Sequence, residues 1–329
     1  KGVIMATLKD VAEKCGVTVT TVSRMLNGRG YVSEKTKKKI LQAMKELNYQ
    51  PNEFARALSL KRSSFIGLIV PSASNMYFSK VIDCVEHFVS KNGYKLLLCV
   101  SNLEPKKEIE YFDMLNANKV AGVIIASHTQ DIDKNIAINA PVISIDRVIS
   151  PRIPSICSDN YQGGVLAAAH LIEKGCRKLA HVSGSIHLNM DANKRYYGFK
   201  EVCERNGIPH VLIDATEEQF QSMQYEALIE MLLDQHPDID GIFTSNDIIA
   251  AQAITICNKR GIKVPEQIKI VGYDDINLCT LYNPTITTIR QSVEDICRYA
   301  VESIIFKTDN KTIPSSIVFP VTLIERETT

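Results

Sequence analysis

The chain has 329 residues, of which 45% are hydrophobic and 23% are charged, and its formal net charge is +1. This composition is typical of a globular protein with roughly two or three folded units. No apolar run approaches the ~20 residues of a membrane span, so we expect no membrane partner. The nine scattered cysteines form no C-x-x-C pair, and the seven histidines have no metal-ligand spacing. We therefore expect a cytoplasmic protein with reduced thiols, no metal and no cofactor.

The charge is unevenly distributed along the chain. Residues 1–62 hold 13 Lys and Arg against 5 Asp and Glu, whereas the remainder holds 25 against 32. Such asymmetry often means only solvation. A basic head on an acidic body also suits a nucleic-acid reader joined to a domain with another task.

Residues 7–27 have the spacing of a helix-turn-helix. Ala12 is small enough for two helices to cross closely, Gly16 permits the turn, and Thr18 is a good N-cap for the second helix. The expected inner residues are Val11, Val17, Val22 and Leu26, and the expected outer ones are Thr20, Thr21, Ser23 and Arg24. An ordinary pair of amphipathic helices in a larger α-domain is the alternative.

A third helix is predicted from Glu34 to about Asn48, with Ser33 as its cap. Its expected inner stripe is Ile40, Leu41, Met44 and Leu47. Pro51 then breaks the helical pattern. The segment 52–60 has helical character, but at about nine residues it is too short to be stable alone.

From Phe65 onward, short apolar strands alternate with amphipathic helices. The expected strands are Ile66–Val70, Leu96–Val100, Gly122–Ala126, Val142–Asp146, Leu179–Ser183, Gly241–Ser245 and Ile268–Tyr273, with a final strand around Ile317–Ile324. The expected helices are 76–91, 105–117, 163–174, 192–206, 222–235, 248–260 and 293–306. This alternation predicts two doubly wound parallel sheets of about 130 residues each, with ligands at the carboxyl edges of the strands.

Several motifs carry a family resemblance along nearly the whole chain. They are Leu8–Asn27 with Gly30–Ser33, Leu47–Asn52, Ala55–Leu58, Ile66–Ile69, Asp159-Asn160 with Gly163-Gly164, Ser245–Asp247, Val271–Asp275 and Thr287–Gln291. In this combination the chain resembles the lactose-repressor (LacI/GalR) family of bacterial transcription regulators. Within that family, Ser127-His128, Ile145–Arg147, Pro151–Pro154 and Leu115–Asn118 look most like the sucrose-operon repressor branch.

The resemblance implies an all-α helix-turn-helix DNA-binding domain followed by a two-lobed α/β domain like that of periplasmic binding proteins. The DNA-binding domain would be 1–50, the hinge 51–64, and the effector-binding and dimerisation domain 65–329. Lobe 1 would comprise about 65–162 and 292–318, and lobe 2 about 163–291 and 319–329.

The resemblance also implies which residues meet DNA. Val19, Thr20 and Arg24 would contact base edges, and Arg24 can pair bidentately with guanine. The residues that would contact phosphates are Thr7, Thr18, Thr21, Ser23, Asn27, Tyr31, Ser33 and Thr36. For the hydroxyl residues, helix caps and a solvated helix surface remain the alternative.

In the family, the hinge helices of two subunits pair in the minor groove. By this resemblance Leu58 would wedge into a central base step, which we expect to be a pyrimidine–purine step. Asn52, Ala55 and Arg56 would line the same groove. An ordinary apolar linker residue is the alternative for Leu58. Two heads imply a homodimer on a pseudo-palindromic double-stranded operator. Because the sequence has no heptad repeat at its end, a four-subunit arrangement is not expected.

The family's effector positions fall here on polar residues at strand ends. They are Asn75, Tyr77, Phe78, Asp146, Arg147, Arg195, Asn246, Asp274 and Gln291. Carboxylates that accept from hydroxyls, with an aromatic face, suit a sugar. A fructose-containing sugar or a pentose is expected, and two arginines leave a phosphorylated sugar open. For each position, a capped helix end or a surface ion pair is the alternative.

These features predict a repressor of a sugar-utilisation operon, controlled allosterically by the sugar in the cleft between the lobes. One alternative is a global regulator with a phosphorylated protein as co-repressor. Another is a sugar-binding protein or an enzyme without DNA function. The sequence lacks the G-x-G-x-x-G, P-loop and G-x-S-x-G motifs, so no enzyme activity is expected.

Overall fold

The computed structural model describes residues 6–50, 63–127, 129, 132, 139–309 and 312–329. Two compact units are present: one contains Lys1–Ser64, and the larger comprises Phe65–Asn116 with Ala121–Thr329. The hinge predictions, Asn52, Ala55, Arg56 and Leu58, and the expected short helix at 52–60 lie outside the described residues.

The smaller unit is a three-helix domain with helices α1 (Leu8–Cys15), α2 (Val19–Leu26) and α3 (Glu34–Glu46). Thr7 and Asp10 form a capping box at the start of α1, and Gly16 takes a φ of 64° at its end. The side chains that form the core are Val11, Ala12, Val22, Ile40 and Ala43. The sequence therefore places a turn where only a residue without a Cβ is unstrained.

One expectation for α3 is wrong. Leu41 is 55% exposed and lies outside the core, whereas Ala43 is buried in its place. The core of so small a domain accepts only a narrow stripe of α3, and Ile40, Ala43, Met44 and Leu47 occupy it. The Leu41 side chain therefore lies on the surface, and a single exposed leucine is common in folded proteins.

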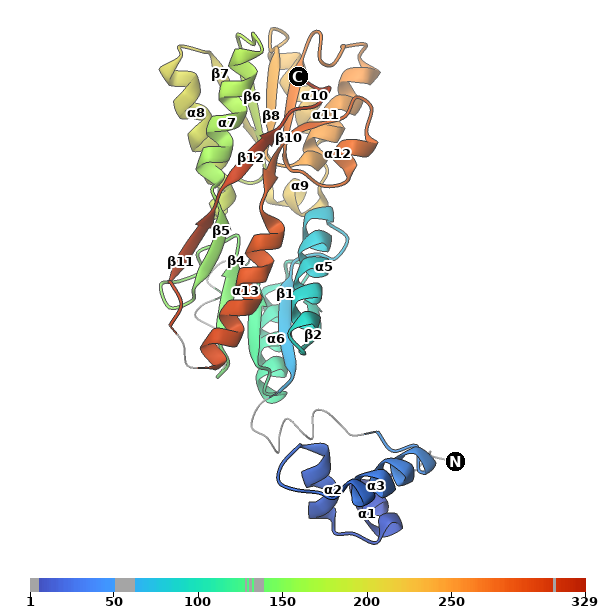
Figure 1. The fold of residues 1–329 in the computed structure, drawn as a ribbon. Helices are drawn as coiled ribbons and strands as arrows, with labels where there is room; N and C mark the ends of the chain where they lie inside the picture. The colour runs from blue at the N-terminus through green and yellow to red at the C-terminus, as the bar shows by residue number, and fades with distance from the viewer. Residues whose placement is uncertain (1–5, 51–62, 128, 130–131, 133–138, 310–311) are drawn as a thin grey trace. The chain divides into compact units, whose positions relative to one another are not determined.

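The larger unit contains two six-stranded sheets, one in each lobe (Figure 1). The first lobe has the strand order β11-β5-β4-β3-β1-β2, and the second has β12-β10-β9-β8-β6-β7. The strands of the first are β1 (Phe65–Val70), β2 (Lys95–Val100), β3 (Gly122–Ile125), β4 (Val142–Ile145), β5 (Ser155–Ser158) and β11 (Ser316–Phe319). Those of the second are β6 (Leu179–Ser183), β7 (His210–Asp214), β8 (Gly241–Thr244), β9 (Lys269–Asp274), β10 (Thr287–Gln291) and β12 (Val321–Ile324). All described pairings are parallel except β10 with β12.

In the first lobe, helices α5 (Met76–Lys91) and α13 (Val293–Thr308) pack against each other and against the sheet. Helix α6 (Pro105–Ala117) approaches β1 closely, because a Cβ on Gly67 would lie 2.8 Å from Leu115. The near-continuous apolar strands thus have helices to bury them on both faces.

In the second lobe, α7 (Asn160–Glu173) and α8 (Lys194–Arg205) pack closely together. A Cβ on Gly164 would lie 1.9 Å from the carbonyl oxygen of Arg195, and one on Gly198 would lie 2.0 Å from that of Tyr161. The remaining helices of this lobe are α9 (Glu217–Ser222), α10 (Glu226–Gln235), α11 (Asp247–Lys259) and α12 (Leu278–Leu281), with the 3-10 helix η2 at Asp191–Asn193. The two glycines allow backbone contact between α7 and α8, which fixes the helix that carries Arg195.

The chain passes between the lobes after β5, after β10 and after β11. The single strand expected around Ile317–Ile324 is instead two strands, β11 and β12, one in each sheet. Pro320 separates them, because it has no N–H to continue a ladder. Strand ends and crossings therefore meet at one level of the molecule (Figure 1).

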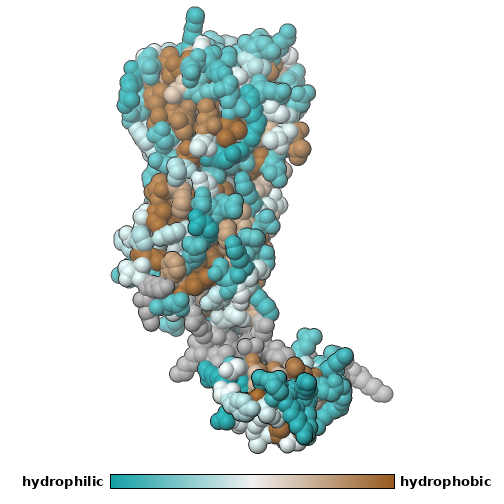
Figure 2. Space-filling view, in the orientation of Figure 1, coloured by the Kyte–Doolittle hydropathy of each residue, from teal (hydrophilic) through white to brown (hydrophobic). Residues whose placement is uncertain are grey.

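The surface carries scattered apolar side chains. Figure 2 shows brown patches over both lobes of the larger unit, separated by teal ones. The large hydrophobic side chains that are exposed include Leu98, Leu281 and Val318. Among the described residues, no helix is both long enough and apolar enough to cross a membrane.

Candidate functional site: an interlobe pocket and a helix-turn-helix surface

A cavity of 490 Å³ lies between the two lobes of the larger unit. Residues from both lobes line it, and the sequence-predicted effector residues are all among them: Asn75, Tyr77, Phe78, Asp146, Arg147, Arg195, Asn246, Asp274 and Gln291. Its volume is within the range of small-molecule sites. The structure therefore brings these nine residues together around one cavity, some at strand ends and others in the first turns of α5 and α8.

Asp146 follows β4, in the left-handed region with φ 59°. The Tyr77 hydroxyl donates to its Oδ2 atom, whereas the buried Oδ1 has no hydrogen-bond partner among the described residues. Burial raises the pKa of Asp146 to about 6. A buried acceptor without a partner is costly unless a ligand donates to it, so Asp146 is suited to accept from a hydroxyl.

Asp274 ends β9 with φ 107°, which is also strained for a residue with a side chain. Gln291 Nε2 donates to Asp274 Oδ1 at 2.6 Å, and Ser158 Oγ donates to Gln291 Oε1 at 2.6 Å. Burial raises the pKa of Asp274 to about 8, although the nearby Arg195 lowers it. The Gln291 side chain therefore links Asp274 by hydrogen bonds to Ser158, at the end of β5, where the chain crosses between the lobes.

Arg195 is held by protein acceptors on several sides. Its Nε donates to Asn160 Oδ1 at 2.7 Å, and its Nη1 donates to the carbonyl of Ser245. The guanidinium carbon lies 3.5 Å from the centre of the Tyr273 ring, a cation–π arrangement. The hydroxyl of Tyr273 also donates to Asn160 Oδ1, at 3.2 Å. Asn160 thus orients both the arginine and the tyrosine.

Arg147 is directed toward its own lobe. It is 6% exposed, and its Nη1 donates to the carbonyl oxygens of Thr129 at 2.6 Å and Ser127 at 3.4 Å. The Ser127 hydroxyl donates to the fully buried carboxylate of Glu108, at 2.7 Å to Oε1 and 2.8 Å to Oε2. Arg147 therefore lines the pocket, but its guanidinium group already donates hydrogen bonds to backbone carbonyl oxygens.

Asn75 and Asn246 are helix caps as well as pocket residues. The Asn75 side-chain oxygen accepts from the N–H of Tyr77 at 3.0 Å, and that of Asn246 accepts from Ile249 at 2.9 Å. Each cap uses the carboxamide oxygen and leaves the NH₂ group to donate. The capped-end alternative and a ligand role are therefore compatible for both residues.

The pocket also contains residues that the sequence analysis missed. They are Asn102, Asn160, Met190, Asn193, Phe220 and Met223, among others. Phe220 lies on α9, which the expected helix 222–235 overlooked. The Thr216–Gln219 capping box was a signal for that helix.

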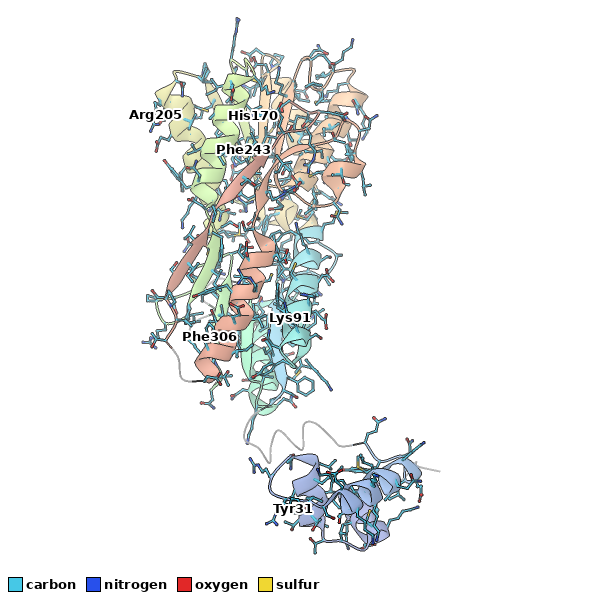
Figure 3. The ribbon with its side chains drawn as sticks, viewed as in Figure 1. Tyr31, Lys91, His170, Arg205, Phe243 and Phe306 are labelled. Atoms are coloured by element: carbon cyan, nitrogen blue, oxygen red, sulfur yellow. The ribbon has the colours of Figure 1, made fainter. Side chains whose placement is uncertain are left out.

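In the smaller unit, the candidate base-reading residues Val19, Thr20 and Arg24 are all exposed. Several candidate phosphate contacts have structural hydrogen bonds: Thr7, Thr18 and Ser33 cap their helices, Thr21 and Thr36 meet the cap hydroxyls, and Ser23 bonds Asn27. Tyr31, labelled in Figure 3, is 92% exposed. The helix N-termini offer N–H groups suited to phosphate.

A family model described as bacterial regulatory proteins, lacI family, matches residues 7–52, and a periplasmic binding protein-like domain matches 168–329. A sucrose operon repressor from Streptococcus mutans is 39% identical over 324 residues, which is 98% of this chain and 99% of that protein. The chain belongs to the lacI family. Since the relatives are transcriptional repressors, this lacI-family chain is a regulator and not an enzyme.

Solved structures of lacI-family proteins agree with this. A Lac repressor dimer bound to operator has a TM-score of 0.85 and 27% identity, covering 98% of each chain. A regulator from Alkaliphilus metalliredigens complexed with D-xylulofuranose has a TM-score of 0.72 and 33% identity, covering 81% of this chain and 99% of that one. The predicted fold class, a helical DNA-binding region with two parallel α/β lobes, is confirmed.

Proposed function

We propose that this lacI-family protein represses a sugar-utilisation operon as a homodimer on a pseudo-palindromic operator, and that a small neutral sugar in the interlobe pocket controls it. The observation that carries the proposal is a pair of carboxyl groups, the half-buried Asp146 and the buried Asp274, that line one cavity. Carboxylates recognise adjacent hydroxyls, and the Tyr77 and Phe78 rings supply an apolar side.

The charges in the pocket favour a neutral ligand over a phosphorylated one. The guanidinium groups of Arg147 and Arg195 already donate to protein oxygens. The carboxylate of Asp146, which is ionised above about pH 6, would repel a phosphate in the same cavity. A fructose-containing sugar or a pentose fits best, and the D-xylulofuranose in the A. metalliredigens relative supports this class.

The route from pocket to operator would be linkage through the lobes. Asp274 contacts Gln291, and Gln291 contacts Ser158, so two of the three crossings adjoin the ligand site. A sugar that binds one lobe arrangement better shifts the spacing of the linkers at 51–64. The change in operator affinity is limited to the differential affinity of the sugar, typically ~1–3 kcal/mol.

The homodimer in this proposal is supported by the relative that is bound to operator as a dimer. Two heads would place α2 of each copy in successive major grooves, with Val19, Thr20 and Arg24 at base edges. The phosphate candidates would fix the register of each head without reading sequence.

The test is operator binding, by gel shift with the DNA upstream of the chain's own gene, with and without sucrose, fructose, ribose and their phosphates. Wild type should bind, and one neutral sugar should change its affinity. Asp274→Ala should bind the same DNA and lose the response, whereas the exposed Tyr197→Ala should keep both. Loss of operator binding in Asp274→Ala would make Asp274 structural, and no DNA binding by wild type would refute the proposal.

A further inference from the structure

Two cysteines from helices far apart in sequence meet in the first lobe. Cys84 lies on α5 and Cys297 on α13, the helix pair that carries Lys91 and Phe306 in Figure 3. Cys297 is buried and its Sγ lies 3.8 Å from the carbonyl oxygen of Val81, to which it donates. Helix carbonyls point toward the C-terminal end, so this oxygen lies beside the next turn, where Cys84 is. Cys297 is part of a buried hydrophobic cluster, and Cys84 packs against the same cluster.

Cys84 differs from the buried cysteines in its environment. Burial raises the pKa of Cys99, Cys176, Cys203 and Cys257 to about 11 or 12. The neighbouring Cys297 thiol instead lowers the pKa of Cys84 to about 7, although burial opposes it. Cys84 is also half-buried rather than buried. A partly exposed thiolate beside a second thiol is the arrangement of an oxidisable pair.

We propose that Cys84 and Cys297 are a peroxide-oxidisable dithiol that closes to a disulfide between α5 and α13. The Cys84 thiolate attacks one oxygen of hydrogen peroxide. The S–O bond forms, the O–O bond breaks, and the departing hydroxide takes a proton to become water. The product is the sulfenic acid of Cys84.

In the second step the Cys297 sulfur attacks the Cys84 sulfur. The S–S bond forms, the S–O bond breaks, and the leaving hydroxide takes the Cys297 proton as a second water. Two thiols lose one electron each, and the peroxide gains two. Cys297 thus resolves the sulfenic acid before it oxidises further.

The position of the pair connects it to the pocket. The first turn of helix α5 contains the pocket residues Tyr77 and Phe78, and α13 starts two residues after the pocket residue Gln291. A disulfide would fasten together two helices whose first turns border the ligand. This consequence rests on the proposed function, whereas the oxidation does not.

The test uses the full chain treated with graded hydrogen peroxide, then alkylated after unfolding without reductant and analysed by peptide mass spectrometry. We expect loss of two thiols and a Cys84–Cys297 cross-linked peptide that dithiothreitol reverses. In Cys297→Ala, dimedone should label Cys84. Cys15, also half-buried but without a neighbouring thiol among the described residues, is the matched internal control.

Oxidation of Cys84 no faster than that of Cys15, or a Cys297 that stays fully alkylatable, would overturn the dithiol. Sugar affinity is then compared in reduced and oxidised wild type, and we expect at least a threefold difference. Equal affinities would refute the connection to the pocket. A reduced protein that binds none of the sugars would instead refute the proposed function.

Discussion

Two adjacent carboxylates in this protein have opposite surroundings. Asp274 faces the pocket, and burial raises its pKa to about 8. Asp275 does not line the pocket. Burial would raise its pKa, but hydrogen bonds from Arg290 at 2.6 Å and Arg326 at 2.7 Å hold its pKa below the usual value. The strained φ of both residues keeps one side chain in the cavity and the other in an ion-pair network.

This contrast predicts opposite effects of removing the charges. Because the pKa of Asp274 is raised in the fold, the unfolded chain loses this proton at lower pH than the folded protein does. The stability of the sugar-free fold therefore falls as pH rises from about 4 to 8. Asp274→Asn should therefore raise the free energy of unfolding, and with it the thermal unfolding midpoint. The gain in free energy should grow with pH over that interval, by at most about 1.4 kcal/mol per pH unit. The gain should be larger at pH 8 than at pH 5.

Asp275→Asn is the matched control. Its depressed pKa means that the charge stabilises the fold above about pH 4, and that this contribution is lost as pH falls through the folded-state value. Asp275→Asn should lower the midpoint at neutral pH. Equal signs for the two variants would contradict the assigned environments.

Arg24 supports a second prediction at the residue scale. Its exposed side chain lies on α2, and bidentate contact with guanine would make it a base reader. Arg24→Ala should weaken operator binding by about 1–3 kcal/mol and relax preference at one base position, measured by competition with single-base operator variants. Lys9→Ala, exposed on α1, should leave that preference unchanged. A uniform loss across all variants would make Arg24 a phosphate contact instead.

At the scale of elements, the buried strands were the most predictable from sequence. Runs such as Phe65–Val70 are apolar at every position, as expected for a strand of a parallel sheet that is buried on both faces. The short strand Ser155–Ser158 has serine at both ends, and only its neighbours in the sheet make it a strand. The pocket residues followed from family motifs, but the orienting role of Asn160 depends on Arg195 and Tyr273 arriving from distant elements.

The contact between α7 and α8 gives the third prediction. A Cβ on Gly164 would meet the backbone of Arg195 and Phe199, which cannot rotate away. Gly164→Ala should reduce the free energy of unfolding by about 2–3 kcal/mol in denaturant titrations. Tyr197→Ala, on the exposed side of α8, should change it little. An unchanged denaturation midpoint for Gly164→Ala would show that the helices move apart without cost.

At the scale of the whole molecule, the two ligands would meet regions of opposite charge. The first 62 residues carry 13 basic against 5 acidic side chains, and the rest is acidic in balance. Binding that neutralises phosphates releases counterions, whereas binding of a neutral sugar does not. The two affinities should therefore respond differently to salt, even though linkage couples them.

The last prediction follows from that difference. Between 50 and 200 mM salt, operator affinity should fall by about 10³-fold or more, as expected for several phosphate contacts per head. Affinity for the neutral sugar, measured by calorimetry without DNA, should change less than about twofold, because buried hydroxyl–carboxylate contacts are little screened. A steep fall in sugar affinity would indicate a charged ligand, and would favour the phosphorylated sugar that Arg147 and Arg195 left open.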